Sequence, residues 1–113
     1  MSIPKLSKCL ALFREQSATF PLTHAQVLME VISDEGLNQT ELVERLDSSR
    51  AAISRAMVGL GEWERKDVPG LRDKPGLGLV ISEMDPNDRR QRRLWLTPKG
   101  KRFAKQLESC LAG

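Results

Sequence analysis

The sequence NQTELVERLDSSRAAISRAMVGL, residues 38–60, contains two short amphipathic patterns separated by a polar break. Apolar residues recur at helical spacing in both halves, at Leu42, Val43, Leu46, Ile53, Ala56, Met57 and Leu60. Asn38 and Glu41 have the spacing of a capping box, and Ser49 is the expected N-cap of the second helix. Because the break at residues 47–48 leaves room only for a sharp turn, the two helices are predicted to cross steeply, as in a helix-turn-helix.

The second predicted helix has polar and basic side chains on the side away from its apolar stripe. These side chains are Ser49, Arg50, Ser54 and Arg55. A positive, hydrogen-bonding helix face of this kind can enter the major groove of DNA. Helical hairpins with solvated arginines are also common in proteins that bind no nucleic acid, so this stretch alone leaves both interpretations open.

Length and composition indicate a single globular domain over residues 1–113. The chain has 40% hydrophobic and 29% charged residues, which is enough for one modest core. It contains no run of about 18 apolar residues that could span a membrane, and residues 1–16 lack the small-residue cleavage site of a signal peptide. Cys9 and Cys110 lie at opposite ends of the sequence without metal-binding spacing. We therefore expect a reduced, cytoplasmic protein without a metal or other cofactor.

The charge of the chain is unevenly distributed, although its net value is only +3. Residues 89–105 include no acidic residue and eight basic ones, Arg89, Arg90, Arg92, Arg93, Lys99, Lys101, Arg102 and Lys105. This segregation predicts one positive face or edge, which suits a polyanionic partner. A solvated surface segment is the competing interpretation.

Two further helices are predicted before the helix-turn-helix. The first begins near Pro4 and is apolar over most of its circumference, so it must be covered on more than one side. We favour a second subunit as that cover over packing within one chain. The next helix covers residues 24–33, with Thr23 and Gln26 as a second capping box. The single histidine, His24, is expected to be exposed in its first turn.

The remainder of the chain predicts a β-hairpin and a last helix. Two β-prone segments, residues 79–81 and 94–96, flank the strong turn sequence of residues 85–88. Thr97 is the expected cap of the last helix, and Pro98 occupies its first position. The predicted fold is thus mainly α with a small β-hairpin, and a helix-turn-helix followed by a basic hairpin is the winged-helix layout.

Two segments resemble the MarR family of bacterial transcription regulators. The sequence GLGLVISEMDPNDRRQRRLWLTPKGKRF, residues 76–103, contains the strand GLV, a D-x-R wing tip and an LTxKG helix start. The sequence NQTELVERLDSSRAAISRAM, residues 38–57, is similar to the family pattern TQxELAxxLxxSxxxVSRxV. The resemblance covers residues 22–103.

The resemblance implies a dimer that binds a pseudo-palindromic site on double-stranded DNA. Arg90 matches the wing arginine that enters the minor groove, and Asp88 matches the acidic residue that orients it through a charge-assisted pair. The complete set of residues expected at the DNA is Gln39, Thr40, Ser49, Arg50, Ala51, Ser54, Arg55, Asp88, Arg89, Arg90 and Arg92.

The chain departs from the family pattern in three places. Only one helix follows the wing, so dimerisation requires a small interface or one that uses the apolar first helix. Residues 64–77 form an insertion that either contacts the DNA backbone through Lys66, Arg72 and Lys74 or, as we favour, is a surface loop. Asp47 replaces the glycine that is common in the turn. The resemblance also raises an unknown small-molecule effector or a redox role for Cys9, but we expect Cys9 to be an inert thiol of the apolar stripe.

The function that these features favour is a sequence-specific transcription regulator, most simply a repressor. One alternative is an accessory or architectural DNA-binding protein of a phage or plasmid, without an effector. Another is a winged-helix adaptor that binds protein through the insertion and Trp63. An enzyme is not expected, because the chain has one histidine, no nucleophile–base pattern and no phosphate-binding glycine loop.

Overall fold

The computed structural model describes residues 2–61 and 76–113 of the chain. Within these residues its elements are α1 (Ile3–Gln16), α2 (Leu22–Ser33), β1 (Leu37–Asn38), α3 (Gln39–Leu46), α4 (Arg50–Leu60), β2 (Val80–Asp85), β3 (Asp88–Leu96) and α5 (Pro98–Ala112). The strands form an antiparallel sheet in the order β1-β3-β2. The predicted winged helix-turn-helix is confirmed, and the hairpin strands are longer than the sequence indicated.

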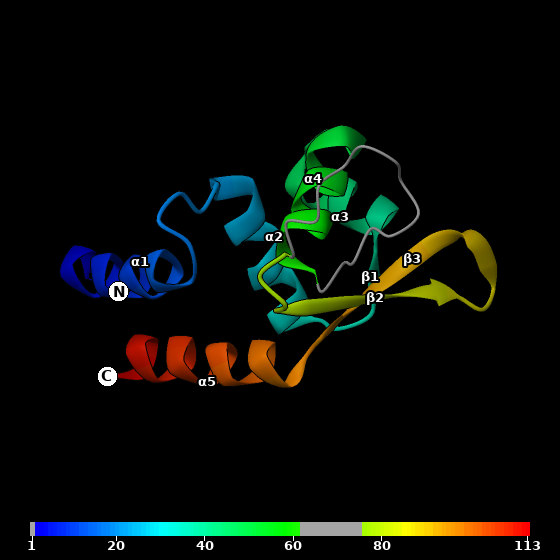
Figure 1. Ribbon diagram of the computed structural model, residues 1–113. Coiled ribbons are helices and arrows are strands. Elements are labelled where there is room, and N and C mark those ends of the chain that lie inside the picture. The colour runs from blue at the N-terminus through cyan, green and yellow to red at the C-terminus, as the bar shows by residue number, and fades with distance from the viewer. Residues whose placement is uncertain (1, 62–75) are drawn as a thin grey trace.

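The molecule has a central body with extensions at two ends (Figure 1). Helices α2, α3 and α4 form the body, and the β2–β3 hairpin projects from one side of it as a wing. Helices α1 and α5 pack side by side at the other end, where both chain termini lie. The candidate DNA-reading elements and the terminal helices therefore occupy opposite ends of the structure.

Side-chain hydrogen bonds cap the first turns of α3, α4 and α5 at the residues that the sequence predicts. Asn38 and Glu41 form the expected capping box. The Ser49 hydroxyl accepts the Ala52 amide at 3.1 Å, and the Thr97 hydroxyl accepts the Gly100 amide at 3.0 Å. Between α3 and α4, Asp47 adopts a left-handed backbone with φ 48°, which ends α3 and turns the chain into α4.

The predicted start of α2 is wrong by two residues. Helix α2 begins at Leu22 with Pro21 as its N-cap, and no side chain caps it. The Pro21 carbonyl accepts the Ala25 amide at 3.0 Å, so the first helical turn is already formed around Thr23. Thr23 consequently has helical backbone and cannot act as the cap, because an N-cap residue has non-helical dihedral angles.

The predicted exposure of His24 is also wrong. Its side chain is half-buried against α4, where a Cβ atom on Gly59 would lie 2.8 Å from the imidazole Cε1. Burial lowers the pKa of His24, and the positive charge of Arg55 lowers it further. The neutral form of the imidazole is therefore favoured at pH 7, and the side chain joins the beginning of α2 to α4.

The core lies between α2, the helix-turn-helix, the sheet and α5. Fully buried side chains include Val27, Leu28, Val31, Leu42, Ile53, Leu60, Leu79, Leu94 and Phe103. Helix α2 is the buried centre that its apolar composition predicts. Phe103 of α5 makes an edge-on contact with Phe13 of α1, with ring centroids 5.1 Å apart. This contact joins the terminal helices to the core.

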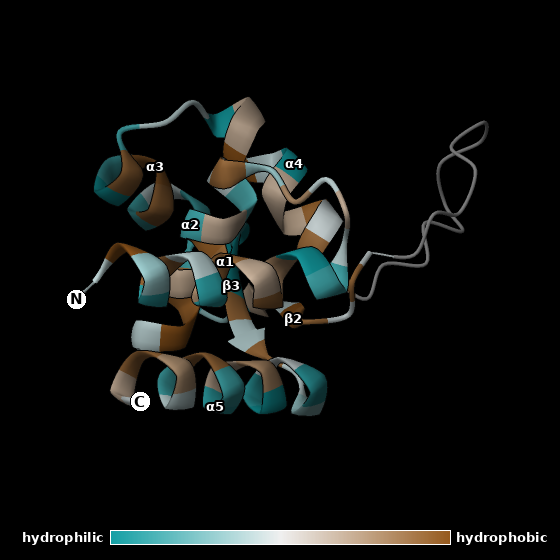
Figure 2. Cartoon of the chain, turned by 90° about the vertical axis from the view of Figure 1, so that its left-hand side faces the viewer, coloured by the Kyte–Doolittle hydropathy of each residue, from teal (hydrophilic) through white to brown (hydrophobic). Residues whose placement is uncertain are grey.

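Helix α1 also keeps apolar side chains at the surface. Ile3, Leu6 and Leu10 are 77%, 41% and 44% exposed. Figure 2 faces this end of the molecule and shows apolar segments on both α1 and α5. Among the described residues, none of the helices is long and apolar enough to cross a membrane.

Candidate nucleic-acid interface

Helix α4 presents the polar face that the sequence predicts. Its apolar residues Ile53, Ala56 and Leu60 are fully buried. Its exposed residues include four of the predicted DNA contacts, namely Arg50, Ala51, Ser54 and Arg55. Ser49 is exposed as well, but its hydroxyl oxygen already caps α4. Helix α4 thus presents an exposed, positively charged face of the kind that can contact a nucleic acid.

The predicted contact residues at the start of α3 make hydrogen bonds with α4. The Gln39 amide nitrogen donates to the Ser54 hydroxyl at 2.6 Å and to the Arg50 carbonyl at 3.1 Å. The Arg50 guanidinium donates to the Thr40 hydroxyl at 3.3 Å. These bonds fix the rotation of α4 relative to α3 and hold Arg50 and Ser54 in defined positions.

The wing is linked to the same network through Gln91 of β3. Its amide nitrogen donates to the Thr40 hydroxyl at 3.0 Å, although the two residues are 51 positions apart. Thr40 therefore accepts one hydrogen bond from Gln91 of the wing and one from Arg50 of α4. The wing and α4, the two elements predicted to contact DNA, are therefore connected through Thr40. Gln91 was not among the predicted residues, and no local sequence pattern distinguishes it.

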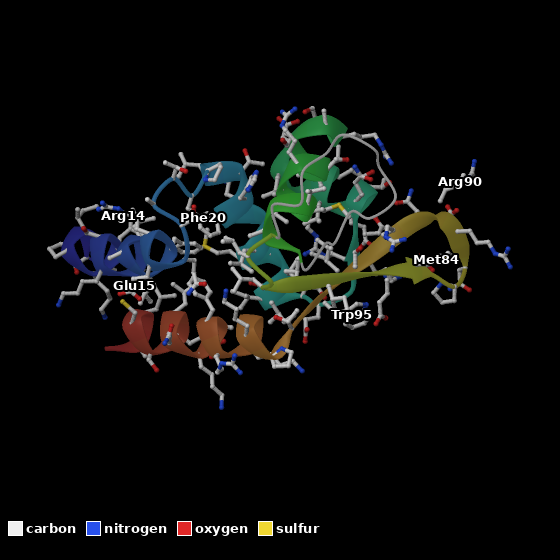
Figure 3. The ribbon with its side chains drawn as sticks, in the orientation of Figure 1. Arg14, Glu15, Phe20, Met84, Arg90 and Trp95 are labelled. Carbon is white, nitrogen blue, oxygen red and sulfur yellow. The ribbon has the colours of Figure 1, made fainter. Side chains whose placement is uncertain are left out.

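The wing tip has the local geometry expected for an oriented arginine. The Asp88 carboxylate accepts the Arg90 amide at 3.0 Å, and its Oδ1 lies 3.6 Å from the Arg90 Nε. The Arg90 side chain is 92% exposed and projects from the outer end of the hairpin (Figure 3). Within the turn, the Asp85 carboxylate accepts the Asn87 amide at 2.9 Å. The turn thus places an exposed guanidinium at the far end of the wing.

The basic segment does not form the single positive face that its composition predicts. Within the wing, the Nε and Nη2 of Arg93 both lie 3.0 Å from the Asp85 carboxylate at the end of β2. Its Nη1 reaches the body, where it donates to the Gly36 carbonyl at 2.7 Å. Arg92 donates to the Ser82 hydroxyl at 3.1 Å on the neighbouring strand. The other half of the segment, from Lys99 onward, belongs to α5. The wing and α5 point in different directions, which divides the charge between two ends of the molecule (Figure 1).

Asp85 and Arg93 fasten the wing to the body. Asp85 is 4% exposed, and the Asn87 amide, followed by the Arg93 guanidinium, holds the pKa of its carboxyl below the usual value. Arg93 also lies 3.9 Å from Glu41, which closes the α3 capping box. The same arginine therefore connects the hairpin turn, the chain before β1 and the start of α3. Sequence reasoning placed Arg93 in the basic segment but missed this role.

A hollow of about 540 Å³ lies beside α4. Its wall includes Phe20, His24, Ser54, Arg55 and Leu77. Aromatic and aliphatic surface is combined there with the Arg55 guanidinium and the His24 imidazole. Such a combination is typical of small-ligand sites. In the described parts of the chain, no three His, Cys, Asp or Glu side chains gather as metal ligands.

Most of the predicted insertion, residues 64–77, lies outside the described residues, as do Trp63, Lys66, Arg72 and Lys74. The chain is described again from Gly76, and the Leu77 amide donates to the Gly59 carbonyl at 2.9 Å. The end of the insertion thus returns to the last turn of α4.

Comparison with known proteins gives structural matches only. The sequence matches no family model and no curated protein. The fold is similar to that of a MarR transcriptional regulator from Methanosarcina mazei Go1, with TM-score 0.69 and 22% identity over 90% of this chain and 62% of that one. It is also similar to the PcaV regulator from Streptomyces coelicolor, with TM-score 0.62 and 24% identity over 96% of this chain and 71% of that one.

A further similar structure is the S. aureus MepR–DNA complex, with TM-score 0.66 and 19% identity over 96% of this chain and 74% of MepR. The chain thus spans about three fifths to three quarters of the length of these regulators. The similarity covers 90–96% of this chain. The chain has the winged-helix fold of the MarR transcriptional regulators.

Proposed function

We propose that this protein is a sequence-specific transcription regulator that binds double-stranded DNA as a homodimer. Helix α4 enters the major groove, and Arg90 of the wing enters the adjacent minor groove. Its simplest action is repression, by occupying a promoter in the cytoplasm. This role needs no catalytic activity.

The observation that carries the proposal is the hydrogen-bonded connection between wing and recognition helix. Gln91 of β3 and Arg50 of α4 both donate to Thr40, at 3.0 and 3.3 Å. A protein that contacts two grooves at once benefits from holding its wing and recognition helix at a fixed separation, because ordering them during binding costs free energy. The connection supplies that separation before DNA is bound. The position of MepR among the similar structures, as a DNA complex, is consistent with this use of the fold.

The homodimer is supported by helix α1. The exposed apolar residues Ile3, Leu6 and Leu10 recur on one side of α1. Burying such side chains against a second copy removes apolar surface from water. A twofold dimer would present two recognition helices to two half-sites about one helical turn apart.

The hollow beside α4 supports regulation by a small-molecule effector. A compound bound there would contact Ser54 and Arg55, which are also predicted DNA contacts. Occupation of the hollow and binding of DNA would then compete for the same side chains. This observation favours a regulator over an architectural protein without an effector.

Selection of bound duplexes from a random pool tests the proposal. We expect a palindrome whose half-sites are about 10 bp apart, and we expect the selected duplex to bind far more tightly than a scrambled one at the same salt concentration. Binding that is steeply salt-dependent but equal for both duplexes would indicate an architectural protein. Retention of a protein partner without any binding of duplex DNA at low salt would indicate an adaptor.

A further inference from the structure

The two cysteines of the chain meet where α1 packs against α5. Cys9 and Cys110 are separated by 101 positions in the sequence, yet the Cys9 thiol donates to the Cys110 sulfur at 3.2 Å. Both are free thiols. The expectation of a single inert cysteine on the α1 stripe overlooked this pairing, because the sequence gives no sign that the terminal helices lie side by side.

The two thiols differ in access to solvent. Cys9 is 3% exposed, whereas Cys110 is half-buried and lines a hollow of about 370 Å³ at the surface. The hydrogen bond to Cys110 raises the pKa of the Cys9 thiol, and burial raises it further. Cys9 is therefore held as a protonated, protected thiol, and a reagent in solution reaches Cys110 first.

Two lysines line the hollow around Cys110, together with Ser2, Pro4, Ser109 and Gly113. Lys5 and Lys8 lie in its wall, and the Lys5 ammonium donates to the Leu111 carbonyl at 3.1 Å, next to Cys110 in the sequence. Neighbouring cations attract anionic reagents. Lys8 lies nearly opposite Leu6 around α1, since successive helical residues are turned by about 100°. The hollow is thus separate from the apolar side of α1 on which we place the dimer contact.

We propose that Cys9 and Cys110 are a redox-active dithiol that forms an intrachain disulfide by exchange with an anionic small-molecule disulfide. The Cys110 thiolate attacks one sulfur of the reagent, the reagent's S–S bond breaks, and its first half leaves as a thiolate that takes up a proton. Cys9 then loses its proton to solvent and attacks the Cys110 sulfur of the mixed disulfide, which expels the second half. Two protein thiols are oxidised, and one small disulfide is reduced to two thiols.

The geometry favours closure within one chain. A disulfide bond is about 2.05 Å long, so the two sulfurs need to approach by only about 1 Å from their present separation of 3.2 Å. The bond would join α1 to α5 and close a loop across almost the whole chain. Such a loop restricts the unfolded ensemble strongly, which raises the melting temperature of the oxidised protein.

Incubation of the reduced protein with glutathione disulfide tests the exchange. We expect the intact mass to fall by two hydrogen atoms, both thiols to disappear from a thiol titration and the melting temperature to rise. The Cys9→Ser variant should accumulate one glutathione adduct on Cys110, because the resolving thiol is gone. The Cys110→Ser variant should react at least tenfold more slowly, because only the buried thiol remains. Equal rates for Cys110→Ser and the wild type, stable adducts on the wild type or cross-links between two chains would overturn the proposal.

The Lys8→Glu variant tests the choice of reagent. It should slow exchange with glutathione disulfide several-fold but leave exchange with the uncharged hydroxyethyl disulfide unchanged. Equal slowing of both reagents would refute capture by charge. A parallel reaction with hydrogen peroxide separates the oxidant classes, and a cross-link that forms with peroxide but not with either disulfide would overturn the exchange route. None of these readouts involves DNA, so they stand apart from the proposed regulatory function.

Discussion

Replacement of Arg90 by alanine removes an exposed cation that pairs with Asp88 at the tip of the wing. The Arg90 side chain is 92% exposed, and its Nε lies 3.6 Å from the Asp88 carboxylate. An exposed pair of this kind contributes at most about 1 kcal/mol to folding, so the free energy of unfolding should change by no more than that amount. Any loss of DNA binding can then be assigned to the interface and not to the fold.

For DNA binding we expect a much larger effect. Removing an arginine that enters a groove costs about 1–3 kcal/mol for each wing, which is roughly a 5- to 150-fold loss of affinity. The assay is fluorescence anisotropy with the selected palindrome and a scrambled duplex at fixed salt concentration, with thermal melting of each variant. The loss should be larger for the palindrome than for the scrambled duplex.

Arg102→Ala is the matched control, because it removes the same charge from an exposed position of α5. We expect its affinity to remain close to that of the wild type. Wild-type affinity in Arg90→Ala would remove the wing from the interface. Equal losses in Arg90→Ala and Arg102→Ala would show that net charge alone governs binding.

Three further variants test the contacts that hold the wing and α5 in place. Arg93→Met should lower the free energy of unfolding by about 1–2 kcal/mol in urea denaturation, because it breaks charged hydrogen bonds that are partly screened by solvent; an unchanged midpoint would contradict this role. The pKa of Asp85 is lowered in the folded protein, so its ionised carboxylate stabilises the fold above about pH 4. This contribution is lost as the pH falls through the folded-state pKa. The stability difference between wild type and Asp85→Asn should accordingly shrink between pH 7 and pH 3, and a constant difference would refute it. Gly100→Ala should destabilise by about 1–3 kcal/mol in thermal melts, because its Cβ would meet the Leu79 carbonyl; Lys101→Ala at the exposed neighbouring position is the control, and a Gly100→Ala protein as stable as this control would be evidence against the close contact.

The sequence alone determined the elements whose signals are local. The Asn38–Glu41 capping box, the Ser49 and Thr97 caps and the turn at residues 85–88 all depend on atoms within three or four positions of one another. The spacing of apolar residues then fixed which face of each helix is buried, because an α-helix repeats every 3.6 residues. These local signals were sufficient to predict the helix-turn-helix and the hairpin. Thr23 shows the limit of such signals. It has a capping pattern, but the helix already begins at Leu22, so Thr23 does not cap it.

The tertiary structure decided what the individual side chains do. Arg90 and Arg93 are the same residue type on the same strand, but only folding brings Asp85 and Gly36 to Arg93 and leaves Arg90 in solvent. Gln91 is joined to α3 across 51 positions, and Cys9 to Cys110 across 101. Contacts between such distant positions arise from the packing of whole elements. Local sequence patterns do not specify that packing. The contact between Gln91 and Thr40 and the pairing of Cys9 with Cys110 could therefore be identified only in the folded chain.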